Sequence, residues 1–453
     1  MSTRAMAESA ARSGARVVAV DFFGDRDQAR AATSYALGRD LGLPPTAAGL
    51  VRAAGRLGAG AVVYGANFEN HPAAIARLGR RHEVLGNEAG AVRKVRDWRV
   101  LRRFCADAGI ACPTTLVAGE EGYARETGGR WLRKRVRSGG GHGVSRWDGE
   151  PLDRAHLLQA EIAGRAASAS FVADGRAARV FALGEQLVGD KALGAHGFAW
   201  CGNILPFPAA GRPGRELAEA VGEMASLLTR RFRLRGVNGL DLVVAEGQWG
   251  SLVPYLVEVN PRVTASMELA ERACGVNVFT LHLAGCAGRL PGGHPAERQA
   301  AGFSPAAGPA AAGDARPAAG LSAASNTVAA AAAAGTSPFF GKAVVFARRA
   351  VVTPDTDAWL EESVGTGRSG SSGRTGGAGG DRPAVRDVPG SGERIAAGHP
   401  VCTVFADGAP DRDACLADLH RAAATMYERL QHGGRRREVR RERETHADQR
   451  SHA

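Results

Sequence analysis

Several features that would assign this chain to a common class are missing from its 453 residues. No run of about 18 apolar residues occurs, so we predict no transmembrane helix. The segment 1–16 has no apolar stretch of the kind that a signal peptide needs. The seven cysteines stand singly, without a Cys-x-x-Cys pair, so we expect neither a disulfide framework nor a zinc site. This cysteine usage fits a reducing, cytoplasmic environment.

Nucleic acid is not an expected partner, although the formal net charge is +12. The most basic stretch, at the C-terminal end, mixes both signs of charge and is typical of a solvated tail. No pattern of stacking aromatics and no nucleic-acid-binding motif accompanies the charge. The basic residues therefore indicate neither a nucleic-acid nor a membrane partner.

Lysine is also scarce: only four of the 58 basic residues are lysine, at 94, 134, 191 and 342. An ammonium group is a compact charge on a flexible stem, whereas guanidinium is a planar fork. Binding a phosphate as a point charge is one task that favours lysine. Chance retention explains any single lysine equally well.

The N-terminal part predicts alternating strands and helices. The apolar run 15–25 ends near Asp21, and the run 58–72 ends in a turn that contains Asn67 and Glu69. Such alternation favours a parallel α/β layer, and polar residues at the carboxyl ends of its strands lie where such sheets bind ligands. Ordinary loop capping is the competing explanation for each of these polar residues.

Composition divides the rest of the chain. Residues 88–116 predict one basic amphipathic helix that stops near Gly109. Ala, Gly and Pro dominate two low-complexity segments, which we expect to be a linker and an insertion. We expect the following units: an α/β domain at 1–88, a second domain at 89–291, a linker at 292–335, a β-rich extension closed by a helix at 336–432 with the insertion 364–383, and a disordered tail at 433–453.

A glycine-rich loop follows a strand that contains lysine. The sequence WLRKRVRSGGGHGV places Lys134 in the strand, and Ser138, Gly139, Gly140, Gly141 and Gly143 in the loop. Glycines let several backbone N–H groups approach an anion without obstruction by a Cβ. The loop matches neither the P-loop nor the dinucleotide-binding pattern. By itself, a glycine run is as often a flexible turn as a phosphate loop.

Two strands near residue 250 predict a hairpin with an oxygen-rich face. The segments LDLVVA and PYLVEVN flank the turn at 246–250, which brings Asp241 near Glu258 and Asn260. Residues 258 and 260 point to the same face because strand side chains alternate. Two carboxylates and an amide oxygen suit Mg²⁺, and Arg262 continues the line toward an anionic group. A salt-bridged strand end is the alternative.

These two motifs, in this order, resemble the ATP-grasp superfamily over residues 88–290. The resemblance implies an α/β architecture with a Rossmann-like domain before a two-lobed ATP-grasp domain and a small β-rich extension. It also implies ATP and one or two Mg²⁺ ions, with Mn²⁺ as a substitute, held by Asp241, Glu258 and Asn260. Lys94 and Lys134 would contact the phosphates, and the loop 138–143 would cover them.

The same resemblance implies the remaining roles. Arg262 would steady an acyl phosphate, with Lys134 as a second catalytic group. Lys191 would be a third phosphate-binding lysine. The adenine would lie against a hinge formed by Gln159, Ala160, Glu161 and Ile162. Two positions depart from the family pattern: Ala166 replaces an acidic residue expected to hold the ribose, and Gly239 replaces an arginine.

The family resemblance predicts an ADP-forming carboxylate–amine ligase that acts on small molecules through an acyl phosphate. The segments 64–72, 196–208 and 260–269 are most similar to ATP-grasp proteins of one-carbon-cofactor clusters (methanofuran and tetrahydromethanopterin). Two alternatives stay open: an enzyme with another acceptor, such as a carboxylase component or phosphotransferase, and a non-catalytic nucleotide-binding protein. A homodimer is also compatible with the resemblance.

Overall fold

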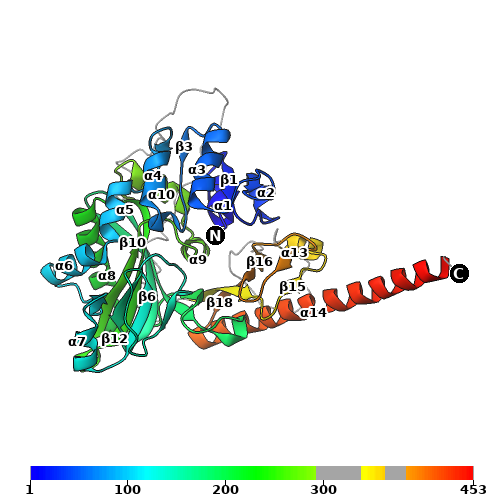
Figure 1. Ribbon diagram of the computed structural model, residues 1–453. Helices are drawn as coiled ribbons and strands as arrows, with labels where there is room; N and C mark the ends of the chain where they lie inside the picture. Colours follow the sequence, from blue (N-terminus) through cyan, green and yellow to red (C-terminus); the bar gives the residue numbers. More distant parts are fainter. Residues whose placement is uncertain (1, 292–337, 363–383, 452–453) are drawn as a thin grey trace.

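The computed structural model describes residues 2–291, 338–362 and 384–451, with side chains as far as residue 431. The predicted linker at 292–335 and the insertion at 364–383 lie outside these residues. Figure 1 shows the N-terminal elements above a large curved sheet, with the last helix running past the sheet and away from the molecule. No helix in the described part of the chain is both long and apolar enough to cross a bilayer.

The N-terminal region contains two short pairs of parallel strands, as the α/β pattern predicts. β1 (Val18–Asp21) pairs with β2 (Thr33–Ala36), and β3 (Ala61–Val62) pairs with β4 (Glu83–Val84). Leu78 and Ile75 of a neighbouring helix pack with Tyr64 and Phe68 into a small core. The helices of this region are α1 (Arg4–Arg12), α2 (Gln28–Ala31), α3 (Ala47–Arg56) and α4 (Pro72–Leu78).

Two helices occupy the segment that predicts a single one. α5 (Ala89–Val95) ends before Asp97, and α6 (Trp98–Asp107) begins after it. Asp97 has an extended backbone, and its carboxylate accepts hydrogen bonds from the N–H groups of Arg99 and Val100. Aspartate is a strong N-cap residue, so it starts a new helix where the apolar periodicity alone predicts continuation. The single-helix prediction was wrong for this reason.

A small antiparallel sheet carries the glycine-rich loop. Its strand order is β5-β8-β6-β7, and the loop connects β6 to β7. Trp131 of β6 packs with Leu116, Leu152 and Leu158 in a separate core under this sheet. The elements are β5 (Thr115–Val117), α7 (Glu121–Thr127), β6 (Trp131–Arg135), β7 (Val144–Arg146) and β8 (His156–Ala160).

The main sheet has eight strands in the order β13-β12-β9-β10-β11-β14-β18-β16. Every pair of neighbours in it is antiparallel. Three strands that follow residue 338, β14, β16 and β18, therefore continue this sheet, whereas β15 (Val351–Val352) and β17 (Arg394–Ile395) form a separate two-stranded sheet. The strands are β9 (Arg165–Asp174), β10 (Ala178–Val188), β11 (Trp200–Leu205), β12 (Arg235–Glu246), β13 (Leu252–Asn260), β14 (Phe339–Phe346), β16 (Val385–Arg386) and β18 (Pro400–Ala409).

Helices cover both faces of this sheet because its strand residues are apolar on both sides. Phe171 of β9 belongs to the core that includes α8 (Gly211–Phe232), whereas its neighbour Val172 belongs to the core with α9 (Met267–Cys274) and α10 (Val278–Cys286). Successive strand residues point to opposite faces, so one strand supplies both cores.

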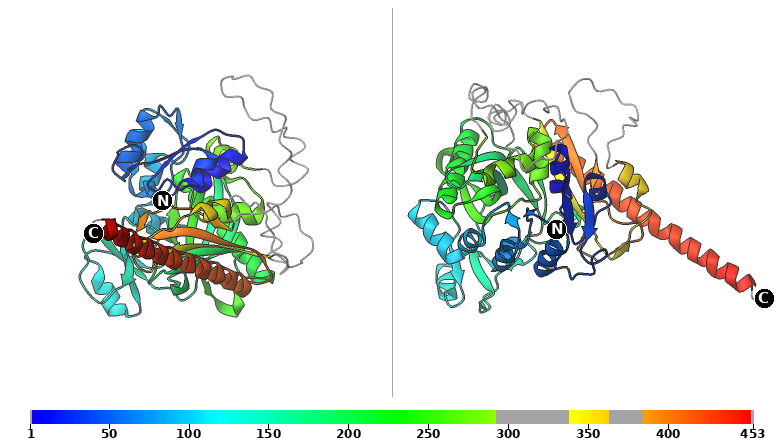
Figure 2. Two further views of the ribbon diagram at one scale, coloured as in Figure 1. Left: turned by 90° about the vertical axis from the view of Figure 1, so that its right-hand side faces the viewer. Right: turned by 90° about the horizontal axis from the view of Figure 1, so that it is seen from above.

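The C-terminal part is tied to the sheet by its last helix. α14 (Arg412–Ser451) packs Cys415, Leu419 and Met426 against strands β14 and β18. The backbone of α14 stays helical through the region for which the sequence predicts a disordered tail (Figure 2). Arg and Glu, which dominate that region, have high helix propensity, and this favours continuation of the helix. The smaller elements here are β15 (Val351–Val352), α13 (Asp357–Glu362) and β17 (Arg394–Ile395).

Candidate active site

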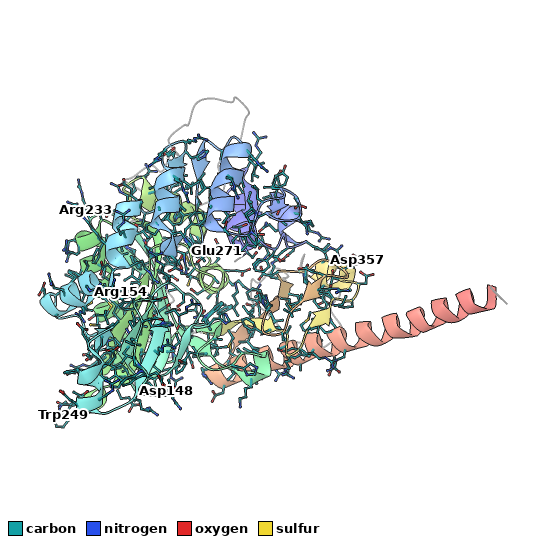
Figure 3. All side chains as sticks on the ribbon, viewed as in Figure 1. Asp148, Arg154, Arg233, Trp249, Glu271 and Asp357 are labelled. Carbon is teal, nitrogen blue, oxygen red and sulfur yellow. The ribbon has the colours of Figure 1, made fainter. Side chains whose placement is uncertain are left out.

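The hairpin of β12 and β13 brings the predicted metal ligands together. Asp241 pairs with Glu258, and Asn260 pairs with Gly239. The register shifts between Asp241 and Leu242, so the ladder is irregular beside the two acids. Such bulges often re-aim a side chain next to an active site. The hairpin prediction is confirmed, and its far end lies at the exposed Trp249, labelled in Figure 3.

Asp241 is held by amides rather than by cations. Its Oδ1 accepts a hydrogen bond from Gln186 Nε2 at 2.8 Å, and its Oδ2 accepts one from Asn260 Nδ2 at 3.0 Å. Burial, together with the charge of Glu258, raises the pKa of Asp241 to about 7. An acid with this pKa keeps a proton part of the time at neutral pH.

Glu258 has the opposite environment. Arg96 Nη1 donates to Glu258 Oε2 at 3.0 Å and to the carbonyl of Val259 at 3.2 Å. Burial alone would raise the pKa of Glu258, but the charges of Arg96 and Lys134 outweigh it and lower that pKa. Glu258 is therefore ionised at neutral pH, whereas Asp241 is partly protonated.

Lys134 faces the two acids from the small sheet. Its Nζ donates to Gln159 Oε1 at 2.5 Å, and Gln159 in turn donates to Thr115 Oγ1 at 3.2 Å. Burial lowers the pKa of Lys134, and the charges of Glu258 and Asp241 oppose that shift. Gln159, predicted at the adenine, is thus a buried side chain that orients this lysine.

Arg262 connects the hairpin to the N-terminal region. Its Nη2 donates to Glu69 Oε1 at 2.6 Å and to Asn260 Oδ1 at 3.2 Å. Arg262 is 6% exposed and Glu69 is 3% exposed, so this ion pair is almost completely buried. Burial alone would raise the pKa of Glu69, but Arg262 outweighs it, and Glu69 stays ionised. Within the described residues, Glu69 Oε2 and Arg262 Nε have no hydrogen-bond partner.

The glycine-rich loop is packed against two other parts of the molecule. Gly140 and Gly141 have φ of +64° and +75°, and a Cβ on Gly141 would overlap the carbonyl oxygen of Phe198. Trp200 N donates to Gly140 O at 2.9 Å, and Asn70 Nδ2 donates to Ser138 O at 3.3 Å. Only glycine fits such backbone conformations and contacts. The loop thus lies between β11 and the N-terminal region.

Three predicted residues stand apart from this group. Lys94 and Lys191 are exposed, and neither side chain bonds to the hairpin acids within the described residues. The cation from this segment that contacts Glu258 is Arg96. Glu161 forms ion pairs with Arg130 at 3.2 Å and Arg146 at 3.7 Å. Its neighbours Ala160 and Ile162 continue the chain from β8 toward β9.

Sequence reasoning missed Arg96 and Gln186. Arg96 lies two residues after Lys94 in the same basic run, and no motif in the sequence distinguishes it. Gln186 lies in β10, with no motif around it, and only the sheet order brings it near Asp241. Glu69 was expected at a strand end, but its pairing with Arg262, 193 positions away, was not foreseeable.

The donor set fits a magnesium ion bound together with a nucleotide. Within the described residues no group of three or more His, Cys, Asp or Glu side chains could form a complete cage. Two facing carboxylates and an amide are present, and one of the carboxylates is bonded to amides rather than to a cation in the part of the chain that the structure describes. Mg²⁺ usually takes one or two carboxylates and completes its shell with phosphate oxygens and water. The residues therefore fit this ion.

Comparison with known families agrees with the geometry. Residues 95–266 match the family model described as ATP-grasp domain. Residues 95–266 are therefore similar to an ATP-grasp domain, and the mixed α/β fold is that of ATP-grasp proteins. No curated protein sequence gives a significant match.

Solved structures show the same fold. The biotin carboxylase domain of Hydrogenobacter thermophilus 2-oxoglutarate carboxylase, in complex with MgADP, ADP and bicarbonate, is 12% identical with a TM-score of 0.56, over 90% of this chain and 84% of that chain. N5-carboxyaminoimidazole ribonucleotide synthetase from Thermus thermophilus is 16% identical with a TM-score of 0.54, over 92% and 95%. Rhizobium etli pyruvate carboxylase is 14% identical with a TM-score of 0.60, over 93% of this chain and 36% of that chain.

Proposed function

We propose that this protein is an ADP-forming ligase that uses ATP to join a carboxylate to an amine through an acyl phosphate. The observation that carries the proposal is the convergence of Asp241, Glu258 and Asn260 with Lys134 and Arg262. They come from two sheets and form one group of oxygen ligands flanked by two cations. Phosphoryl transfer needs such positioning and charge neutralisation more than it needs a protein nucleophile.

Each residue of this group would have a separate role in binding ATP, the metal ion or the group being transferred. Lys134, oriented by Gln159, would neutralise phosphate oxygens of ATP. The backbone N–H groups between Ser138 and Gly143 would bind further phosphate oxygens and exclude water. Asp241, Glu258 and Asn260 would hold Mg²⁺, or Mn²⁺, which neutralises charge on the phosphates when bound. Arg262, held by Glu69, would face the group being transferred.

The reaction balances without a group covalently attached to the protein. An oxygen of the substrate carboxylate attacks the γ-phosphorus of ATP, the bond to the bridging oxygen breaks, and ADP leaves. The nitrogen of the amine then attacks the acyl carbon, loses a proton and expels inorganic phosphate. Enclosure by the glycine-rich loop matters because water would otherwise hydrolyse the acyl phosphate.

A second candidate is a carboxylase-like reaction, in which bicarbonate is the acid. The similarity to a biotin carboxylase domain whose structure holds MgADP and bicarbonate favours this alternative. The same residues would serve both reactions, since each begins by phosphorylating a carboxylate-type oxygen. Dependence of ADP release on added bicarbonate would distinguish the two.

The finer assignment concerns the substrates. The resemblance of segments 64–72, 196–208 and 260–269 to proteins of one-carbon-cofactor biosynthesis makes glutamate and amines of the tyramine and aminomethylfuran types the first substrates to test. We propose that the enzyme acts on such small molecules in the cytoplasm.

The decisive experiment is a product assay. The purified chain is incubated with MgATP, glutamate and a panel of amines, and ADP, AMP, phosphate and pyrophosphate are quantified. We expect ADP and phosphate in equal amounts, only when acid and amine are both present. AMP and pyrophosphate would exclude the acyl-phosphate route. Glu258→Ala with Asn260→Ala should abolish turnover and the MgATP-induced rise in melting temperature; an unchanged rise would refute the metal assignment.

A further inference from the structure

A cavity that lies well away from the hairpin acids is lined by three arginines, together with four other residues. It has a volume of about 290 Å³. Strand β12 begins at Arg235 on its rim, whereas Asp241 lies six residues further along. At roughly 3.3 Å per residue the two points are about 20 Å apart. The cavity is therefore separate from the candidate active site. Its lining residues are Glu88, Ala91, Asp174, Gly175, Arg176, Arg233 and Arg235.

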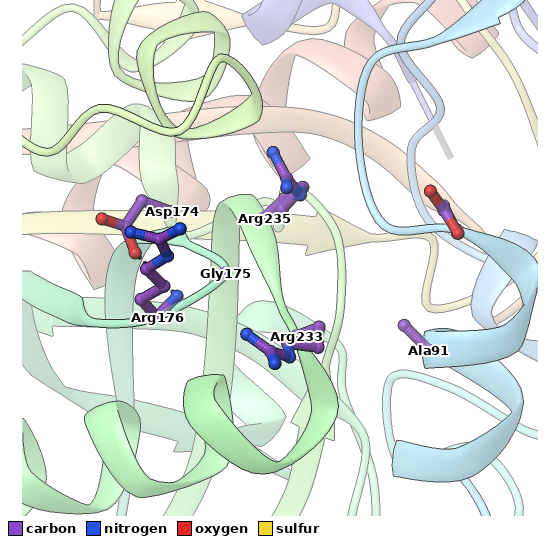
Figure 4. Close-up of a pocket in the computed structure, with 7 residues that line it drawn as sticks. Ala91, Asp174, Gly175, Arg176, Arg233 and Arg235 are labelled. Atoms are coloured by element: carbon purple, nitrogen blue, oxygen red, sulfur yellow. Dashed lines mark hydrogen bonds between the residues drawn. The ribbon is translucent and has the colours of Figure 1, made fainter.

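Three segments that are distant in the sequence bring these residues together (Figure 4). The β9–β10 turn supplies Arg176, and the junction between α8 and β12 supplies Arg233 and Arg235. The start of α5 forms the opposite wall, with Ala91 facing the arginines in Figure 4. Three guanidinium groups thus gather on one side of a small cavity.

Hydrogen bonds to neighbouring segments hold one of the three arginines, Arg235, in place. Arg235 Nη1 donates to the carbonyl of Cys286 at 3.1 Å, and Arg235 N donates to Asn87 Oδ1 at 2.8 Å. The side chain of Arg235 also lies over Gly175, where φ is +91° and a Cβ would come within 3.6 Å of Arg235 Nε. A contact at that distance is ordinary, so the positive φ, rather than crowding by Arg235, favours glycine at this turn.

The other two arginines lack protein partners. Within the described residues, neither Arg176 nor Arg233 has a side-chain hydrogen bond or an ion pair. The carboxylate of Asp174 is engaged, since its Oδ1 accepts from the N–H groups of Arg176 and Ala177. Three cations thus face two acids, of which one is already committed to the turn. The residues that line the cavity therefore carry a net positive charge.

We propose that this cavity binds a small phosphate-bearing anion. Guanidinium groups bind phosphate oxygens in bidentate fashion, and two of the three here have free donors. The volume lies near the lower end of the usual range for ligand sites, so it suits a small phosphorylated molecule rather than a large one. The proposal does not depend on the reaction assigned to the hairpin site.

Calorimetric titration of the full chain with inorganic pyrophosphate, without magnesium, tests this proposal. Arg176→Gln with Arg233→Gln should raise the dissociation constant by roughly tenfold or more, since charge-assisted hydrogen bonds are lost. The matched control is Arg103→Gln with Arg215→Gln, which removes the same charge from two exposed positions outside the cavity. The control should bind as the parent does.

Three outcomes would overturn the proposal: no saturable binding by the parent, an equal weakening in both double variants, or loss of binding in Lys134→Ala with full binding in the cavity variant. The last would assign the anion to the glycine-rich loop. Arg176 and Arg233 are exposed, so the melting temperature of the ligand-free cavity variant should match the parent. Misfolding would therefore not imitate a loss of the site.

Discussion

Two acidic residues, Glu268 and Asp241, have opposite environments, although both lie beside the same sheet. Glu268 accepts hydrogen bonds from Arg4 at 2.6 and 2.8 Å and from Lys342 Nζ at 2.5 Å. Among the residues that the structure describes, Asp241, across the hairpin from Glu258, accepts hydrogen bonds only from the amides of Gln186 and Asn260. Glu268 is thus bonded to two cations, and Asp241 to neutral groups.

The pKa values of the two acids record this difference. Burial alone would raise the pKa of Glu268, but Arg4 and Lys342 outweigh it and hold that pKa well below its usual range. For Asp241, burial and the charge of Glu258 act in the same direction and raise the pKa to about 7. The carboxylate of Glu268 is therefore already neutralised by the fold, whereas that of Asp241 is left available for the cation that the proposed function requires.

The largest effect is expected at Glu268. Glu268→Ala leaves Arg4 and Lys342 buried without their shared carboxylate, and we expect the free energy of unfolding to fall by about 3 to 5 kcal/mol. Urea denaturation measures it. Glu258→Ala, whose partner Arg96 is 11% exposed, is the comparison and should cost less. A loss below about 1 kcal/mol for Glu268→Ala would mean that the cluster is not structural.

The next effect concerns ligand binding at Asp241. Asp241→Asn keeps the shape of the side chain but removes a charge that Mg²⁺ needs. We expect the ligand-free protein to be at least as stable as the parent at neutral pH but to lose the stabilisation by MgATP, which amounts to about 2.7 kcal/mol at a hundredfold excess over Kd. Melting curves with and without MgATP measure this loss. Full retention of the stabilisation would contradict the assignment of Asp241 as a ligand.

Stability should depend on pH in opposite directions for the two acids. In the folded state, Asp241 has a pKa raised from 3.8 to about 7, so between these values it holds a proton that the unfolded chain releases. Its contribution therefore falls as pH rises through this window, by at most about 1.4 kcal/mol per pH unit. The pKa of Glu268 is depressed, so its contribution is lost as pH falls below the usual range.

Denaturation of the metal-free protein at several pH values, with EDTA present, tests these signs. Asp241→Asn should flatten the decline between weakly acidic and neutral pH. Glu268→Gln should flatten the loss in acid and leave the neutral region unchanged. If Asp241→Asn instead steepened the decline, the raised pKa would be incorrect.

The smallest effect is expected at the tip of the hairpin that carries the site. Trp249 is 100% exposed, so Trp249→Ser should change the free energy of unfolding by no more than about 0.5 kcal/mol. Turnover and the response to MgATP should also be unchanged. A clear loss of either would show that the tip contacts a substrate or partner, and the site would then extend beyond the base of the hairpin.

Local patterns predicted the hairpin and the glycine-rich loop correctly. Alternation along 254–260, with a turn at 246–250, was enough to place Asp241 opposite Glu258. The same kind of reasoning failed at 88–116, where the cap at Asp97 divides one predicted helix into two. It also did not identify Arg96, which contacts Glu258, because residue type was visible in the sequence and orientation was not.

The sequence by itself therefore determined the parts of this protein that depend on near neighbours: the hairpin, its alternating polar side chains and the loop of glycines. Tertiary structure decided which charges meet. Glu69 reaches Arg262, Arg4 reaches Glu268, and β14 extends the main sheet beside β11, each across a long separation in the chain. The physical reason is that the pKa and role of a buried acid depend on the partners that folding brings within hydrogen-bonding distance.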